Sequence, residues 1–139
     1  MTDRISKEHR SWNMSRIRSK DSSPEMRVRS YLHRHGYRFR LHYKSLPGNP
    51  DIVMPKHKTV VFVHGCFWHR HKGCKFAYKP KSRVEFWEAK FKNNLLRDEA
   101  VMTQLLRGGW KVIVVWECEI RKSDLFEARM KKLDLEILY

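Results

Sequence analysis

The strongest constraint on this chain is the run from residue 62 to residue 74, which holds two cysteines and three histidines within thirteen positions. Cys66, His71 and Cys74 are soft or borderline ligands close enough in sequence to bind one zinc ion, and a closed tetrahedral site needs one more ligand. The third cysteine of the chain, Cys118, lies far downstream. If Cys118 is the fourth ligand, a structural zinc connects this run to the C-terminal part of the chain, and metal binding contributes to folding.

The net charge indicates the kind of partner. Lysine and arginine outnumber aspartate and glutamate 30 to 15 in 139 residues, a formal net charge of +15. Such a charge predicts a polyanionic partner, with nucleic acid as the first candidate and a solvated basic surface as the alternative. The hydrophobic content of 41% excludes a simple basic tail protein.

Length and cysteine usage bound the organisation of the chain. We expect one domain over residues 23–139, preceded by a basic arm over residues 1–22. The arm has many basic and few apolar side chains, so it would become ordered on a phosphate backbone, with a disordered tail as the alternative. Three cysteines cannot all form disulfides, and no apolar run reaches the length of a membrane span. We therefore expect a soluble protein of a reducing cytoplasm, without a membrane partner.

Periodicity and turn residues predict the helices. The first helix begins at Ser23-Pro24-Glu25, where an N-cap residue, a proline and an acid follow one another, and it ends at Gly36. Two more helices are expected over residues 84–107 and from Ser123 onward. Their apolar stripes consist of Trp87, Phe91, Leu95, Met102 and Leu105 in the former, and of Leu125, Met130, Leu133 and Ile137 in the latter.

Four strands are expected over residues 37–41, 51–54, 59–63 and 110–116. Residues 37–41 alternate between apolar and basic, which predicts a half-buried strand with arginines on its open face. Residues 59–63 are continuously apolar, which predicts a strand covered on both faces. The order of helices and strands predicts an α/β fold, with a mixed sheet between helices.

Asp51 is the acid placed where a nuclease core would carry a metal ligand, at the start of a strand after a proline-rich turn. A carboxylate there can bind Mg²⁺, which polarises a phosphodiester and stabilises charge on the leaving oxygen. The alternative is a turn residue that caps its own backbone. The histidines favour the metal site, because His64 ends an adjacent strand, His69 follows closely, and either imidazole could act as general base or orient water.

Two adjacent aromatic residues, Phe67 and Trp68, lie between polar ligands in the same run. Side chains of this kind can wedge between base steps and unstack them, which requires least free energy at a mismatch. Trp87, early in the next helix, is a third candidate. Its alternative is a place in the core, because a tryptophan on an amphipathic helix usually packs inward.

Motifs spread from about Ser11 to about Cys118 occur in a familiar order. They are Asn13-Met14, Asp21-Ser22 with Glu25, Leu46-Pro47-Gly48 before Pro50-Asp51, His64-Gly65-Cys66-Phe67-Trp68-His69, Glu85-Phe86-Trp87, Asn93 or Asn94 with Arg97-Asp98, Gly109-Trp110, and Trp116-Glu117-Cys118. Together they resemble the very short patch repair (Vsr) endonucleases. The run from residue 64 to residue 69 is the most specific part of the resemblance.

The resemblance implies a restriction-endonuclease-like α/β fold and a Mg²⁺-dependent hydrolase that nicks DNA. Such enzymes cut the strand 5′ to the thymine of a T:G mismatch, which arises when 5-methylcytosine deaminates within a methyltransferase site. The nick initiates very short patch DNA repair. The implied partners are mismatched double-stranded DNA and mismatch-repair proteins, in the cytoplasm and nucleoid of a bacterium. A monomer suffices to nick one strand of an asymmetric mismatch.

The resemblance also implies a role for each matching residue. Asp51 and the backbone carbonyl of Val63 would bind catalytic Mg²⁺, His69 would activate the attacking water, and Glu25 and His64 would hold the water shell. The structural zinc ligands would be Cys66, His71, Cys74 and Cys118. The intercalating side chains would be Phe67, Trp68 and Trp87, which we call the aromatic wedge.

The chain departs from related patterns in three places. Phe62-Val63-His64 supplies neither the second acid nor the lysine that the wider nuclease superfamily carries on this strand, as expected for the Vsr branch. Valine at position 63 keeps the carbonyl but lacks the hydroxyl often found there. Gly73 lengthens the spacing between two zinc ligands relative to some members, and a flexible glycine can absorb the extra residue.

Three alternative functions remain at this point. The first is a zinc-containing DNA-binding module without catalysis, against which Asp51, His64 and His69 argue together. The second is a general nuclease of the same fold acting on branched or single-stranded DNA, against which Phe67 and Trp68 argue. The third, a mismatch glycosylase, would need no Mg²⁺ ligand.

Overall fold

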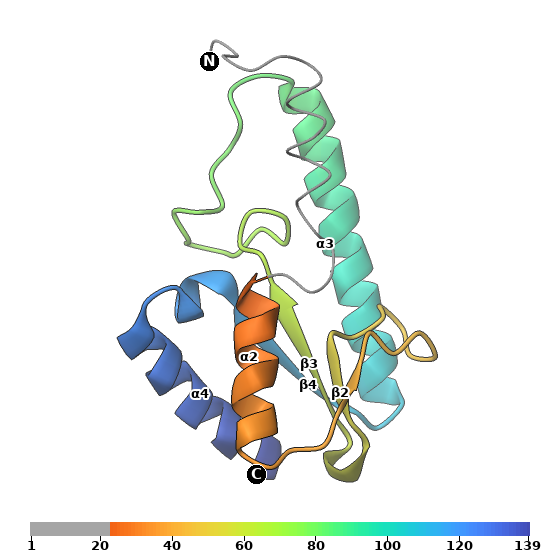
Figure 1. The fold of residues 1–139 in the computed structure, drawn as a ribbon. Helices are drawn as coiled ribbons and strands as arrows, with labels where there is room; N and C mark the ends of the chain where they lie inside the picture. The colour runs from red at the N-terminus through yellow and green to blue at the C-terminus, as the bar shows by residue number, and fades with distance from the viewer. Residues whose placement is uncertain (1–22) are drawn as a thin grey trace, which may run out of the picture.

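A four-stranded sheet lies between helices in the computed structural model, which describes residues 23–139 (Figure 1). The strands are β1 (Arg40–Leu41), β2 (Ile52–Met54), β3 (Thr59–His64) and β4 (Lys111–Trp116). The α-helices are α2 (Ser23–Arg34), α3 (Val84–Arg107) and α4 (Ser123–Leu138), and the short 3₁₀ helices are η1 (Pro55–His57) and η2 (Glu117–Ile120). The predicted basic arm at residues 1–22 lies outside the described residues. None of the helices in the described part could span a membrane.

The sheet is mixed, as predicted. Its order is β1-β2-β3-β4, with β1 and β3 antiparallel to β2, and with β4 parallel to β3. A parallel pair needs a long crossover connection, which here contains the loop after β3 and the whole of α3. The register pairs His64, the last residue of β3, with Trp116, the last residue of β4. The loop after β3, which carries the candidate zinc ligands Cys66, His71 and Cys74, therefore leaves the sheet beside the end of β4.

Side-chain alternation along the strands produces a hydrophobic core on each face of the sheet. Helices α2 and α4 cover one face, and α3 crosses the other (Figure 1). The buried residues of the first core are Val28, Leu32, Ile52, Met54, Val61, Ile113, Val115, Ile120, Met130, Leu133 and Ile137. Those of the second are Val53, Val60 and Leu105. The expectation that the third strand is covered on both faces is confirmed for its buried first half.

The strand predicted at residues 37–41 is largely wrong. Only Arg40 and Leu41 pair with β2, and both are exposed. Tyr37 and Phe39 instead pack against the core before the chain reaches the sheet. Their apolar side chains produced the alternating pattern, but the burial comes from packing next to the sheet rather than from strand pairing.

The two predicted helical stripes are buried only in part. Leu95 and Met102 of α3 are 47% and 39% exposed, and Leu125 of α4 is 45% exposed. Phe91 and Leu105 of α3 are buried as expected. Leu95 lies near the middle of α3, whose N-terminal half extends past the strand ends beside the loop after β3 (Figure 1). Met102 lies in the C-terminal half that packs on the sheet, where Val101 and Leu105 contact the core instead. Helical periodicity cannot reveal where a helix leaves its sheet.

Tyr31 and Tyr37 predict an alkaline limit to stability. Both hydroxyls donate to the carboxylate of Asp134, at 2.5 and 3.0 Å. Burial, and then this contact, raises the pKa of each tyrosine from 10.0 to about 12. The contribution of the two protonated tyrosines to the free energy of unfolding is therefore complete below pH 10 and is lost as the pH rises towards 12. In urea unfolding, wild type should lose more stability over this window than the double variant Tyr31→Phe/Tyr37→Phe. The control, Tyr139→Phe at an exposed position, should behave as wild type.

Candidate active site and metal centre

Asp51 lies beside the end of β3, because β2 and β3 are antiparallel and Ile52 pairs with Val61. One carboxylate oxygen of Asp51 accepts a hydrogen bond from the backbone N–H of Val63 at 2.8 Å. Both residues line a cleft of about 570 Å³. The cleft lining also includes His64, His69, Arg97 and Asp98. The side chain of Val63 packs against the core, and the backbone N–H makes the polar contact with Asp51.

The surroundings of Asp51 suit a divalent cation. Burial raises its pKa to about 7, with a further contribution from Glu25 and an opposing one from the N–H of Val63. Glu25 is 2% exposed and lies 3.0 Å from Nε2 of His42. Glu25, His42 and Asp51 each offer a ligand atom within 4.8 Å of the others. A buried and a half-buried carboxylate this close oppose each other's ionisation, and a cation with oxygen ligands removes that repulsion.

His69 is held by a carboxylate. Its Nδ1 lies 2.7 Å from Oδ2 of Asp98, which favours the tautomer with the proton on Nδ1 and leaves Nε2 as a proton acceptor. His64 stacks on His69 with ring centroids 3.7 Å apart and planes inclined by 4°. Burial, and then the charge of His69, lowers the pKa of His64 to about 4, so His64 is neutral at neutral pH. The cleft thus holds one oriented and one neutral imidazole.

Three residues here received no role from the sequence. His42 adjoins Glu25, Asp98 orients His69, and the side-chain amide of Asn94 donates to the carbonyl of Trp68 at 3.2 Å. Asn94 and Asp98 are four positions apart and therefore lie on one face of α3. That spacing of polar residues, on a helix expected to bury an apolar stripe, is the sequence signal that could identify them. His42 has no comparable signal.

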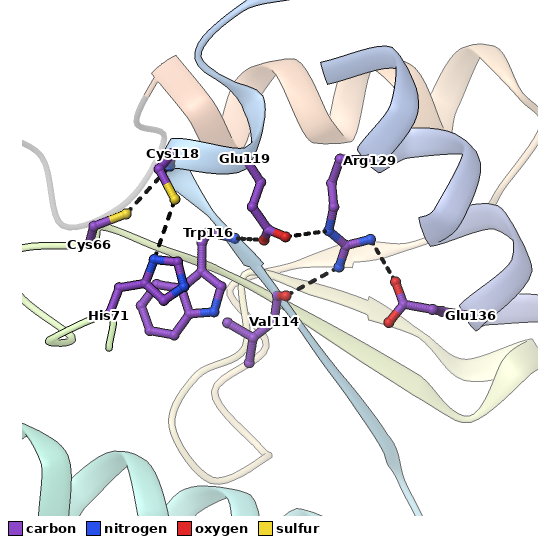
Figure 2. Close-up of polar contacts among 8 residues, drawn as sticks. All are labelled: Cys66, His71, Val114, Trp116, Cys118, Glu119, Arg129 and Glu136. Carbon is purple, nitrogen blue, oxygen red and sulfur yellow. Dashed lines mark hydrogen bonds and ion pairs between the residues drawn. The ribbon is translucent and has the colours of Figure 1, made fainter. Parts of the chain in front are cut away.

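The four predicted zinc ligands come together at the start of η2. Cys66, His71, Cys74 and Cys118 each offer a ligand atom within 4.8 Å of the others. The backbone N–H of Cys118 donates to Sγ of Cys66 at 3.4 Å, and Sγ of Cys118 lies 3.3 Å from Nδ1 of His71 (Figure 2). Tetrahedral zinc ligands lie roughly 3.4–3.8 Å apart, so the arrangement is compatible with zinc.

The chemistry of the thiols also fits a metal. Burial raises the pKa of Cys66, and burial with the neighbouring thiols raises that of Cys118 to about 12. At Cys66 and Cys118 a soft cation stabilises the thiolate forms that the surroundings otherwise disfavour, whereas hydrogen bonds already lower the pKa of Cys74 despite its desolvation. Gly73 adopts a φ of +74°, a left-handed conformation that favours glycine, and Cys74 still reaches the cluster. The extra residue is therefore accommodated in a turn.

A network of polar contacts fixes the segment that carries Cys118 (Figure 2). The backbone N–H of Trp116 donates to Glu119 at 2.7 Å, and Glu119 pairs with Nε of the buried Arg129 at 3.4 Å. Arg129 also pairs with Glu136 at 2.6 Å and donates to the carbonyl of Val114 at 3.2 Å. The network connects β4, η2 and α4, so packing of α4 restrains the position of Cys118.

The members of the aromatic wedge contact one another. The ring of Phe67 lies 5.2 Å from that of Trp68 and 5.4 Å from that of Trp87, centroid to centroid. Two rings that were not predicted to intercalate also contact Phe67, Tyr78 at 5.0 Å and Phe91 at 5.2 Å between centroids. We call these five residues the aromatic cluster. Trp87 is half-buried within it and lies outside both cores of the sheet.

Comparison with known proteins identifies the relatives of this chain. The sequence model of the family described as DNA mismatch endonuclease Vsr matches residues 2–75. The type II nicking enzyme V.XorIIP of Xanthomonas oryzae pv. oryzae is 50% identical over 133 residues, which cover 96% of this chain and 97% of that protein. V.NmeAIP, a type II nicking enzyme of Neisseria meningitidis, is 44% identical over 137 residues, with 99% and 97% coverage.

A third relative carries the family name itself. The DNA mismatch endonuclease Vsr of Escherichia coli K12 is 42% identical over 121 residues, which cover 87% of this chain and 77% of that protein. The family model spans more than half of this chain, and the relatives align over most of it. The resemblance found in the motifs is therefore confirmed, and this chain belongs to the Vsr family of DNA endonucleases.

Proposed function

We propose that this protein nicks one strand of duplex DNA on the 5′ side of the thymine in a T:G mismatch, and so initiates very short patch repair at deaminated methylation sites. The observation that carries the proposal is one cleft lined by Asp51, Val63, His69 and Asp98. The loop that supplies His69 also supplies Phe67 and Trp68. The names of the relatives, two nicking enzymes and one mismatch endonuclease, support both the reaction and the substrate. The pairing order of the sheet supports a restriction-endonuclease-like fold.

The residues around Asp51 would hold a catalytic metal. Asp51 and the backbone carbonyl of Val63 are its proposed ligands, with Glu25 and His64 binding water around it. When bound, Mg²⁺ would polarise the phosphodiester and stabilise charge on the leaving oxygen. The hydrogen bond from the N–H of Val63 keeps the Asp51 carboxylate in position.

His69 is the proposed general base. Its Nε2 takes a proton from the attacking water, and Asp98 stabilises the imidazolium through Nδ1. The water oxygen bonds to phosphorus as the bond from phosphorus to the 3′ oxygen breaks. The 3′ oxygen takes a proton from water, and the imidazolium of His69 releases its proton to solvent. The products are a 5′-phosphate and a 3′-hydroxyl, so atoms and charge balance without a covalent intermediate.

Zinc and the aromatic wedge would have separate tasks. Zinc at Cys66, His71, Cys74 and Cys118 would join the loop after β3 to η2 and contribute folding free energy. The wedge would enter the base stack beside the mismatch, where unstacking requires least free energy. The net charge of +15 would attract duplex DNA of any sequence, so the discrimination must come from the wedge and the cleft.

A strand-specific nicking assay tests the proposal. The substrates are T:G duplexes in several methylation contexts and matched T:A duplexes, with Mg²⁺ at moderate salt. We expect one cut, 5′ to the mismatched thymine, and none in T:A duplexes. Equal cutting of paired DNA would favour the general nuclease, and zinc-dependent binding without any cut would favour the non-catalytic module.

Replacement of Asp98 by asparagine should slow nicking by about 10²–10⁴-fold, because an amide no longer enforces the productive tautomer of His69. Single-turnover nicking of a T:G duplex measures the rate, and binding of the same duplex should stay near the wild-type level. Glu99→Gln, at the next and exposed position of α3, is the control and should nick at the wild-type rate. An unchanged rate in Asp98→Asn would show that the carboxylate does not orient His69.

A further inference from the structure

Arg70 occupies a strained backbone position next to the aromatic wedge. Its φ is +51°, in the left-handed region that residues other than glycine rarely adopt. Such a conformation persists only where surrounding contacts fix it. The side chain of Arg70 makes contacts of that kind.

Three backbone carbonyls accept hydrogen bonds from the guanidinium of Arg70. Nη1 donates to the carbonyls of Phe67 at 3.2 Å and Tyr78 at 3.1 Å. Nη2 donates to the carbonyl of Ala77 at 2.9 Å. A planar guanidinium has enough fixed donors for this, whereas the ammonium of lysine is a single point charge. Arg70 therefore joins Phe67, near the start of the loop after β3, to Ala77 and Tyr78, in the later part of the same loop that leads into α3.

The same guanidinium packs on the aromatic cluster. Its central carbon lies 3.9 Å from the ring centroid of Phe91, a residue of α3 that is 8% exposed. Cation–π attraction strengthens when the pair is shielded from water. With their carbonyls bonded to one side chain, Phe67 and Tyr78 stand with ring centroids 5.0 Å apart and planes inclined by 33°. Tyr78 is 60% exposed, so this pair of rings reaches the surface.

We propose that Arg70 is the positioning residue of the aromatic wedge: it fixes Phe67 between Tyr78 and Phe91, so that rigid rings meet a mismatched base step. A mobile ring would lose conformational entropy on insertion, which would offset the free energy gained by stacking. This inference rests on the proposed mismatch-directed function. Exposed Lys72, two residues away, allows a control that removes the same charge.

Limited trypsin digestion tests the positioning without DNA. The variants are Arg70→Gln, Arg70→Lys and Lys72→Gln, each with its zinc content measured by mass spectrometry. Cleavage after Lys81, in the segment between Tyr78 and α3, should be at least about fivefold faster in Arg70→Gln than in wild type or Lys72→Gln, because that segment loses its restraint. Arg70→Lys should be intermediate, and if Arg70→Gln fails to retain zinc, Arg70→Lys serves for the comparison. Cleavage of the Arg70 variant at the wild-type rate would overturn the proposal.

The ratio of T:G to T:A duplex binding provides the functional readout. Arg70→Gln should lower this ratio about tenfold, as expected when a stacking contribution is lost. Lys72→Gln should weaken binding to both duplexes alike. An unchanged ratio in Arg70→Gln, with wild type discriminating, would overturn the role of Arg70 and leave the proposed function intact. If wild type itself does not discriminate, the proposed function fails, and the trypsin result alone decides whether Arg70 positions the rings.

Discussion

Replacement of Asp51 by asparagine is expected to reduce nicking of a T:G duplex by at least about 10³-fold, because a lost metal contact removes several kcal/mol of transition-state stabilisation. Asparagine keeps an oxygen that can accept the hydrogen bond from the N–H of Val63, so the fold should persist. Binding to the mismatched duplex should also persist. The measurement is single-turnover nicking together with mismatch binding for the same preparation.

The pKa of Asp51 adds a second expectation for this variant. The pKa of Asp51 in the folded protein is raised from the ordinary aspartate value of 3.8 to about 7, so ionisation of Asp51 opposes folding of the Mg²⁺-free protein as the pH rises from 3.8 towards 7. At pH 8, Asp51→Asn should therefore melt no lower than wild type without Mg²⁺, and Mg²⁺ should raise the melting temperature of wild type alone. No chelator is used, since it would also remove zinc.

Two controls separate catalysis from structure. Asp124→Asn, at an exposed position in the first turn of α4, should nick as wild type does. Asp51→Ala removes the acceptor as well and should cost about 1–3 kcal/mol in stability, because the N–H of Val63 loses its partner. Loss of mismatch binding in Asp51→Asn would mean that Asp51 is structural, and nicking near the wild-type rate would exclude it as a metal ligand.

Replacement of Cys118 by serine is expected to destabilise the whole fold. Structural zinc contributes on the order of 10 kcal/mol to the folding of zinc-finger peptides, which is comparable to the whole stability of a typical domain, about 5–15 kcal/mol. Each kcal/mol lowers the melting temperature of a domain of this size by about 3 °C, so a fall of more than about 10 °C is expected. Native mass spectrometry and thermal unfolding measure zinc content and stability together.

The zinc prediction has a neighbouring control. Glu117→Gln changes a partly exposed residue of η2 next to Cys118 and should keep both zinc and the wild-type melting temperature. Chelation of zinc from wild type should reproduce the effect of Cys118→Ser. A Cys118→Ser protein that stays folded with zinc bound would contradict the four-ligand site.

Local signals in the sequence accounted for much of the fold. Helix α3 has the predicted bounds. The signals that set them, an apolar stripe at helical spacing and the glycine pair after Arg107, depend only on residues close together in sequence. The mixed sheet also followed from strand order. The predicted strand at residues 37–41 failed because Tyr37 and Phe39 are partly buried against a core whose residues are mostly distant in sequence. Leu95 stayed exposed because α3 is longer than the sheet it covers, and Met102 stayed exposed because its neighbour Val101 contacts the core instead.

The candidate site divides in the same way. The spacing of Cys66, His71 and Cys74 predicted a metal-binding loop in advance, because those side chains lie within one short segment, and the structure brings them together with Cys118. The Asp98 contact to His69, the place of His42 beside Glu25, and the three carbonyls held by Arg70 were decided only by tertiary structure. Each of these contacts joins residues whose distance in space depends on how α3, the loop after β3 and the sheet pack together. Local periodicity in the sequence carries no information about that distance.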